Sequence, residues 1–230
     1  MPKHPLANIV RRMIAVIILC AGSTAAMAQS DQQKLVNEAD TTLSNFIRDP
    51  QMTWLHDNIG RAKGLLIAPT IAKAGFIFGG SGGRAVLVGR DAKSGKWAGP
   101  VFYTMATASV GFQAGISVSE MVTMVMSNKA MDALLANSVK FGPDASIAAG
   151  PVGAGAKADV VTDLVSFSRS KGVYGGLNLD GTVVAVSNDW NDAYYGKNGI
   201  SPPDILVRMN AHAKGADKLL ANVSRDAAKR

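Results

Sequence analysis

The spacing of apolar residues changes near residue 62. Residues 31–47 (DQQKLVNEADTTLSNFI) place apolar side chains at helical spacing on one face, and the opposite face is polar and net acidic. From residue 62 onward, short apolar runs alternate with glycine-rich segments, a pattern typical of strands joined by tight turns. The chain is therefore predicted to begin its folded part with an amphipathic helix and to continue as strands.

The strands are predicted from apolar runs that end at glycine, proline or a polar turn. Pro69 is expected to end the first strand, and the Gly-Gly-Ser-Gly-Gly segment 79–83 is expected to form a turn. The predicted strands are 65–67, 74–78, 84–90, 97–103, 110–116, 161–168, 173–179 and 182–187.

Two further helices are predicted. Residues 119–136 have a wide apolar surface behind Ser119 as N-cap, and their methionines suit irregular core space. Residues 203–218 form the second, after a polar loop at 188–199. The predicted fold class is α+β, a single domain of mainly antiparallel strands with N-terminal, internal and C-terminal helices.

Residues 1–28 resemble a secretory signal. A basic start precedes the apolar run 13–21, and Ala26-Met27-Ala28 is a small-x-small site, so cleavage is predicted after Ala28. An uncleaved anchor is an alternative, but the run is short for a bilayer. Lipidation of Cys20 is another alternative. It is disfavoured because a small residue usually precedes a lipidated cysteine, whereas here Leu19 does. The expected location is periplasmic or secreted, with residues 29–230 as the mature domain.

Removal of the predicted leader also lowers the net charge of the protein. The whole chain has 24 basic and 17 acidic side chains, a net charge of +7, and residues 1–28 hold three of the basic ones and no acidic one. The mature chain then carries +4, has no basic run suited to phosphate tracking, and is not expected to bind nucleic acid. Cys20 is the only cysteine, so the mature chain contains no disulfide.

The sequence contains little evidence for catalytic or metal-binding motifs. Residues 79–83 match G-x-S-x-G, but a strand rather than a helix follows Ser81, so a serine hydrolase is only a remote alternative to a non-enzymatic protein. No phosphate loop has the required glycine spacing. No metal site or cofactor is predicted, because the Asp189 and Asp192 region fits a hydrated loop better than a calcium loop.

Several short motifs in fixed order resemble the SYLF domain over roughly residues 35–208. They are Ala62-Lys63-Gly64, Lys73-Ala74-Gly75-Phe76, Gly82-Gly83, Gly95-Lys96-Trp97, Pro100, Gly111-Phe112-Gln113-Ala114-Gly115, Ala149-Gly150-Pro151-Val152-Gly153, Tyr174-Gly175-Gly176-Leu177 and Asn191-x-x-Tyr194-Tyr195-Gly196. Eukaryotic members bind phosphoinositide membranes through a basic amphipathic N-terminal segment, and fungal members also bundle actin. The resemblance implies lipid binding. The acidic helix face argues against phosphoinositide specificity, and the secretion leader argues against actin.

The predicted function is non-enzymatic binding of a membrane lipid or apolar ligand in the bacterial cell envelope. Two sets of residues are expected to contact lipid, one apolar and one basic: Phe46, Ile47, Trp54 and Leu55, and Lys34, Arg48, Arg61 and Lys63. The alternative is an envelope structural or protein-interaction module without a lipid ligand, whose interface would use the aromatic side chains of Trp97, Phe102, Tyr103, Tyr194 and Tyr195.

Overall fold

The computed structural model describes residues 29–75, 78–110, 115–155, 160–170, 173–174 and 179–228. The chain from Asp31 onward forms one compact unit. The predicted leader, with Cys20 and its cleavage site, lies outside the described residues. So do Phe76 and residues 111–114 and 175–177 of the family motifs.

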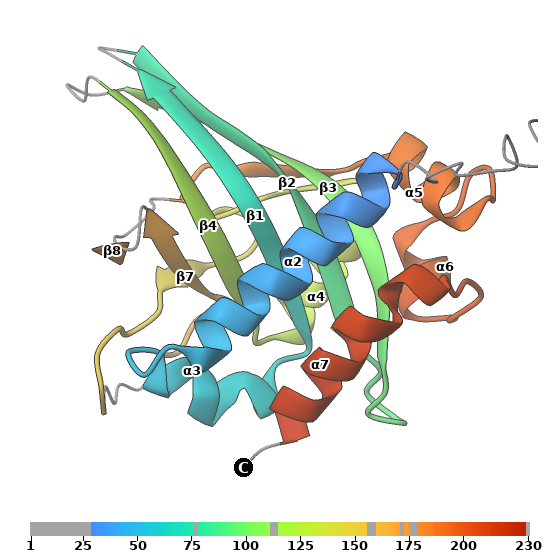
Figure 1. Ribbon diagram of the computed structural model, residues 1–230. Coiled ribbons are helices and arrows are strands. Elements are labelled where there is room, and N and C mark those ends of the chain that lie inside the picture. Colours follow the sequence, from blue (N-terminus) through green and yellow to red (C-terminus); the bar gives the residue numbers. More distant parts are fainter. Residues whose placement is uncertain are drawn as a thin grey trace, which may run out of the picture. The chain divides into compact units, whose positions relative to one another are not determined.

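A single sheet forms the centre of this unit (Figure 1). Its strand order is β5-β9-β3-β2-β1-β4-β7-β6, with β8 paired to β7, and among the described strands only β6 and β7 run parallel. The bounds are β1 Gly64–Gly75, β2 Phe78–Arg90, β3 Trp97–Val110, β4 Gly115–Val125, β5 Ser138–Lys140, β6 Ile147–Ala149, β7 Leu164–Ser170, β8 Val173–Tyr174 and β9 Val183–Val186.

Helices lie at both ends of the unit and between the strands. They are α2 Asp31–Arg48, α3 Thr53–Asn58, η1 Ile59–Arg61, α4 Asn128–Leu135, α5 Asn188–Tyr195, α6 Pro202–Leu206, η2 Lys214–Ala216 and α7 Asp217–Ala228. The predicted α+β class with N-terminal, internal and C-terminal helices is confirmed.

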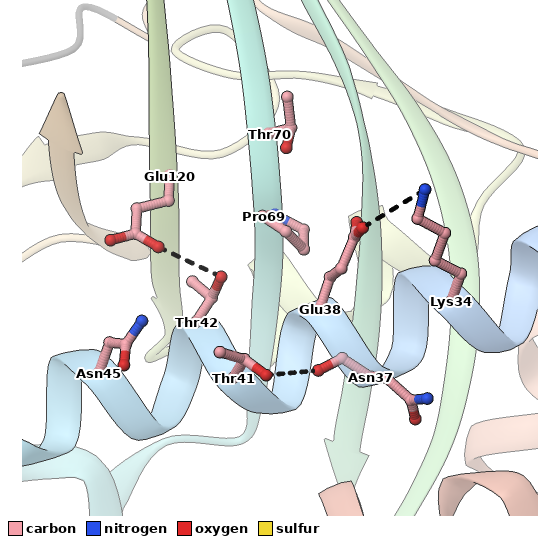
Figure 2. Close-up of a pocket in the computed structure, with 9 residues that line it drawn as sticks. All are labelled: Lys34, Asn37, Glu38, Thr41, Thr42, Asn45, Pro69, Thr70 and Glu120. Carbon is pink, nitrogen blue, oxygen red and sulfur yellow. Dashed lines mark hydrogen bonds and ion pairs between the residues drawn. The ribbon is translucent and has the colours of Figure 1, made fainter. Parts of the chain in front are cut away.

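Helices α2 and α7 cover one face of the sheet (Figure 1). The predicted apolar stripe of α2 is buried there, from Leu35 to Phe46, on the Leu65 and Ile67 side chains of β1. The helix prediction for 31–47 is thus confirmed, and its apolar face packs on the domain's own core. The polar flank of α2 borders a groove along the sheet (Figure 2).

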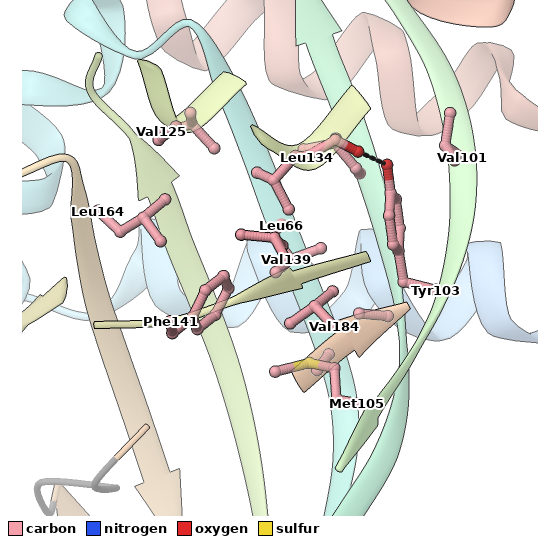
Figure 3. Close-up of a cluster of buried hydrophobic side chains, with 14 of the residues drawn as sticks. Leu66, Val101, Tyr103, Met105, Val125, Leu134, Val139, Phe141, Leu164 and Val184 are labelled. Atoms are coloured by element: carbon pink, nitrogen blue, oxygen red, sulfur yellow. Dashed lines mark hydrogen bonds between the residues drawn. The ribbon is translucent and has the colours of Figure 1, made fainter. Parts of the chain in front are cut away.

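The opposite face of the sheet has a second core (Figure 3). Leu66 and Ala68 point to this side, because successive residues of a strand alternate between faces. Helix α4 packs here, and the buried Tyr103 hydroxyl of β3 donates to the Leu134 carbonyl oxygen at 2.5 Å. The central strands are therefore covered on both faces, which explains their unbroken apolar sequences.

Two predicted strand ends are wrong. Strand β1 continues through Pro69 to Gly75, with a register irregularity between Ile67 and Thr70 that accommodates the proline. The 79–83 segment is not a turn but part of β2. Strands β1 and β3 pair with it on either side, so its backbone groups are satisfied although glycine has a low strand propensity.

The long internal helix predicted at 119–136 is also wrong. Residues up to Val125 belong to β4, and only Asn128–Leu135 is helical. The cap is Ser127, whose hydroxyl oxygen accepts from the Ala130 N–H. The apolar run in β4 mimicked a helix because Met121 and Val122 are buried on opposite faces of the sheet.

The C-terminal part contains more helices than predicted. Residues 188–195 form α5 rather than a loop. The helix predicted at 203–218 is instead the short α6, followed by α7, which takes in the charged tail. Residues of the family motif at 191–196 attach α5 to β3. The Asn191 side-chain oxygen accepts from the buried Phe102 N–H at 2.9 Å, and the Tyr195 hydroxyl donates to the Pro100 carbonyl oxygen at 2.8 Å. Gly196 ends the helix at φ 61°.

Candidate functional site

Three of the residues predicted to contact lipid lie in the core. The side chains of Phe46 and Leu55 are fully buried and that of Trp54 is 5% exposed. Trp54 packs beside the Phe167 ring with centroids 6.0 Å apart, and the Arg169 guanidinium lies over the Phe46 ring. In this conformation these side chains stabilise the fold and present no surface to a lipid.

The predicted residues of α2 do not form a joint surface with the others. Ile47 is half-buried against the core, and Arg48 is exposed in the last helical turn. Lys34 lines the groove beside the sheet and lies 4.0 Å from Glu38 (Figure 2). Of the helices in the described part of the chain, none is long and apolar enough to cross a membrane.

Arg61 and Lys63 do come together, in a pocket of about 570 Å³ at the start of β1. Arg90, at the end of β2, and Lys93, in the turn that follows, also line it. We call it the basic pocket. Its lining residues are Arg61, Ala62, Lys63, Arg90, Asp91, Ala92, Lys93, Gly95, Asn128, Met131, Asp132, Leu135, Leu206 and Val207.

Hydrogen bonds hold the two arginines of the pocket in place. Arg90 donates to the Gly60 carbonyl oxygen at 2.7 Å, and the Arg90 N–H donates to the Lys63 carbonyl oxygen at 2.8 Å. Arg61 donates to the Asn58 side-chain oxygen at 2.8 Å. The η1 turn and the end of β2 are thereby tied together, and the basic side of the pocket is built before any ligand arrives.

The other side of the basic pocket is apolar. It consists of Met131 and Leu135 from α4 and of Leu206 and Val207 from α6, of which Val207 is 58% exposed. Glycine makes room for this wall, since a Cβ atom at Gly89 would lie 2.7 Å from the Met131 methyl carbon. The pocket thus combines cations with aliphatic surface, as an amphiphilic anion requires.

Positive charge outweighs negative charge in this pocket. Four cations face two carboxylates, Asp91 and Asp132. Asp91 accepts two hydrogen bonds from Ser94, at 2.6 Å from its N–H and from its hydroxyl, and these lower the pKa of Asp91. The Asp91 carboxylate therefore accepts hydrogen bonds that order the 91–96 turn.

The described residues contain no catalytic geometry that would support the alternative function of a serine hydrolase. Ser81 lies inside β2, so no nucleophile elbow forms. Of the two histidines in the mature chain, His56 lies 3.4 Å from the Phe46 carbonyl oxygen and His212 pairs with Asp217 at 3.1 Å. The described residues also contain no cluster of acidic, histidine or cysteine side chains that could hold a metal.

A family model described as the Las17-binding protein actin regulator, Ysc84, matches residues 106–225, more than half of the chain. This chain belongs to the Ysc84 (SYLF) family. The resemblance expected from the motifs is thereby confirmed. The matched residues include the apolar wall of the basic pocket, from Met131 to Val207, while the four cations lie before them.

Ysc84 relatives occur in yeast and in animals. The chain is 33% identical over 167 residues to "Protein YSC84" of Saccharomyces cerevisiae, covering 70% of this chain and 35% of that protein. It is 34% identical over 149 residues to "LAS seventeen-binding protein 3" of the same species, 62% and 32% of the two chains. It is 30% identical over 142 residues to human "SH3 domain-containing YSC84-like protein 1", 60% and 41%.

The chain therefore spans about a third to under half of these relatives. The family description refers to Las17 binding and actin regulation, one relative is named for binding, and none of these names refers to a catalysed reaction. The predicted absence of enzymatic activity agrees with these names only at the level of the family.

Proposed function

We propose that this Ysc84-family domain binds an anionic amphiphile, with membrane lipid as the leading candidate, in the basic pocket. The observation that carries the proposal is the juxtaposition of four cations with an aliphatic wall in one cavity of about 570 Å³. A phosphate or carboxylate headgroup would lie against Arg61, Lys63, Arg90 and Lys93. The acyl chain would lie along Leu135 and Val207.

The energetics of such a site are favourable but modest. Apolar burial contributes about 25 cal/mol per Å², so covering roughly 100 Å² of the aliphatic wall is worth about 2.5 kcal/mol. Charge-assisted hydrogen bonds to the headgroup add about 1.5–3 kcal/mol each when water is excluded. The binding is therefore expected to weaken with salt, because Arg61, Arg90 and Lys93 are exposed.

We also propose, from the predicted leader at residues 1–28, that the protein performs this function in the bacterial envelope. That actin is not a partner stays a prediction from the leader. The alternative of an aromatic protein interface has less support, since Phe102 and Tyr103 are buried and Tyr194 packs edge-on against Phe102 at 5.0 Å.

Co-sedimentation of the mature chain with liposomes tests the proposal. Vesicles of phosphatidylglycerol and phosphatidylethanolamine should retain the wild type, and pure phosphatidylcholine vesicles should not. The charge reversal Lys63→Glu combined with Lys93→Glu should weaken binding at least tenfold, because two of four cations become anions.

Lys34→Glu is the matched control, because it makes the same change at an exposed residue of α2 in a different groove. It should leave binding within about twofold of the wild type, whereas Lys63→Glu alone, which reverses the same number of charges, should weaken binding more. Equal losses for Lys34→Glu and Lys63→Glu would show that binding depends on net charge rather than on the basic pocket. Retention of the double variant on anionic vesicles would refute the basic pocket as the site.

A further inference from the structure

A short exposed segment, residues 207–210, follows α6 beside the basic pocket. Val207 lines the pocket and is 58% exposed, and Met209 is 38% exposed. Arg208 and Asn210 are exposed as well. Single exposed apolar residues are common on protein surfaces, whereas two within three residues at the mouth of a pocket indicate a contact surface. We call this segment the rim turn.

Hydrogen bonds fix the backbone of the rim turn. The Arg208 N–H donates to the Pro203 carbonyl oxygen and the Asn210 N–H donates to the Asp204 carbonyl oxygen, each at 2.9 Å. The Lys197 ammonium donates to the Asn210 carbonyl oxygen at 2.7 Å. The rim turn is therefore an ordered part of the domain, and the exposure of its apolar side chains is set by the fold.

The backbone at Met209 is strained. Its φ is 51°, a left-handed conformation that no other non-glycine residue of the described ranges adopts. This conformation is unfavourable for a side chain that cannot form a local hydrogen bond, as Asn or Asp can. Strained residues concentrate at functional sites, where the surrounding structure holds them in place. An exposed, strained methionine beside the basic pocket fits such a role.

The aliphatic wall of the basic pocket is shorter than an acyl chain. Met131 and Leu135 lie one turn apart on α4, which is about 6 Å along the helix. The acyl chains of one leaflet fill about 15 Å, half of the hydrocarbon core of a bilayer. Leu206 is buried and Val207 is exposed, so the wall is open to the surroundings at Val207. A chain that lies on this wall would leave the protein beside the rim turn.

The charge around the rim turn suits an anionic surface. Arg208 adds a fifth cation to the four of the basic pocket, and its partner Asp204, at 2.5 Å, adds a third carboxylate to Asp91 and Asp132. The Arg208 side chain and three of the pocket cations are exposed. Exposed lysine and arginine side chains of this kind are attracted to anionic lipid headgroups.

Other occupants account for fewer of these features. The rim turn has four exposed residues, far fewer than the roughly 20–30 residues a side of a stable protein interface. A free amphiphile would leave the outer part of its acyl chain in water. A bilayer keeps that part of the chain in hydrocarbon and also takes up individual apolar side chains at its interface.

We propose that the rim turn inserts Val207 and Met209 into an anionic bilayer, and that the basic pocket binds a lipid that remains in its leaflet. Arg208 and the exposed cations of the pocket lie among the headgroups. This inference rests on the proposed function and adds the partner, which is a bilayer surface rather than a free amphiphile.

A comparison of vesicles with a soluble lipid tests the proposal. Met209→Asn removes the apolar side chain but suits the left-handed backbone, so the melting temperature should not fall. Met209 is not a lining residue of the pocket, so monomeric dihexanoylphosphatidylglycerol should bind the variant within about twofold of the wild type. Binding to vesicles of phosphatidylglycerol and phosphatidylethanolamine should weaken about fivefold or more, because apolar contact with the bilayer is lost.

Val161→Asn is the matched control, because it makes a similar change at a residue that is 97% exposed and does not line the pocket. It should change neither binding constant. A fluorophore at Met209→Cys in a Cys20→Ser chain should show blue-shifted emission on the vesicles, and one at Val161→Cys should not.

Three results would overturn the insertion of the rim turn and leave the basic pocket intact. They are vesicle binding of Met209→Asn within about twofold of the wild type, an equal effect of Met209→Asn and Val161→Asn, and a wild type that binds the soluble lipid but no anionic vesicle. A wild type that does not bind the soluble lipid would instead refute lipid binding in the basic pocket, and this inference with it.

Discussion

Asp163 links three segments that are distant in sequence. Its carboxylate accepts from the Ser127 hydroxyl at 2.5 Å and from the Ser146 hydroxyl and N–H at 2.8 and 3.0 Å. Ser127 caps α4, Ser146 precedes β6 and Asp163 itself precedes β7. These hydrogen bonds, first that from Ser127, lower the pKa of Asp163 to about 2.

Asp163→Asn should therefore destabilise the fold in a pH-dependent manner. A lowered pKa means that the ionised form stabilises the folded state, fully above the unfolded value of about 3.9 and progressively less as pH falls towards 2. Urea unfolding at pH 7 should show a loss of about 2 kcal/mol, since hydrogen bonds to charged groups are worth about 1.5–3 kcal/mol. The difference from the wild type should shrink between pH 4 and pH 2. A constant difference across that range would contradict this role of the charge.

At the scale of elements, the β1–β2 pair shows why glycine occupies the middle of a strand. Strand β1 changes register at Pro69, and this brings the Thr70 carbonyl oxygen close to Gly83. A Cβ atom at Gly83 would lie 2.3 Å from that oxygen, whereas one at the neighbouring Gly82 would meet only an ordinary contact at 3.4 Å. The family motif Gly82-Gly83 thus reflects a steric need at its second position.

Gly83→Ala should destabilise the domain, and Gly82→Ala should not. The first change forces a backbone shift at the β1 irregularity, for which overpacking costs of about 1–3 kcal/mol are typical. The second is expected within about 0.5 kcal/mol of the wild type. Thermal unfolding of both variants measures the contrast, and equal melting temperatures would show that β1 adjusts freely.

At the scale of the whole domain, the basic pocket and an exposed apolar surface lie at opposite ends of β1. The basic pocket includes Lys63, just before the strand. The apolar surface begins at Ala72 and consists of two rows across β1 to β4, which we call the apolar rows: Val118, Ala72, Gly82 and Ala106, and Ile116, Ala74, Gly80 and Ala108. Nine residues of strand separate Lys63 from Ala72 by about 30 Å, so a single flat membrane surface is not expected to contact both.

Lipid quenching should report this orientation. A fluorophore at Ala92→Cys, in the basic pocket, should be quenched by nitroxide lipids in anionic vesicles, and one at Ala72→Cys should not. Both labels are placed in a Cys20→Ser chain at exposed alanines, so each is the other's control. The reverse pattern would mean that the apolar rows, rather than the basic pocket, meet the membrane.

Much of the fold could be predicted from local patterns. The apolar stripe of α2 has a clear helical period, so this helix was predicted close to its bounds. The polar 91–96 turn fixed the end of β2 at Arg90 and the start of β3 at Trp97, but β2 begins earlier, at Phe78, and β3 continues to Val110. The predictions failed at 119–125 and 79–83. An apolar run without alternation fits a helix and a doubly buried strand equally well, and glycine is read as a turn unless neighbouring strands are known.

The site could be predicted only in part. Arg61 and Lys63 were singled out by charge, and the structure brings them together in the basic pocket. Phe46, Trp54 and Leu55 were chosen as apolar contacts because apolarity alone does not distinguish a core residue from a lipid-facing one. Arg90 and Lys93 were missed, although their position around a hairpin turn next to a motif glycine was a usable signal.

The sequence by itself determined the family, the α+β class and the apolar face of α2, since these depend on motif order and on short-range periodicity. Tertiary structure decided which surfaces remain free. The basic pocket needs η1, the β2 end, α4 and α6 together, and the apolar rows exist only because four strands align their small residues in register. Such long-range pairings are set by packing of the whole domain, which no local pattern in the chain contains.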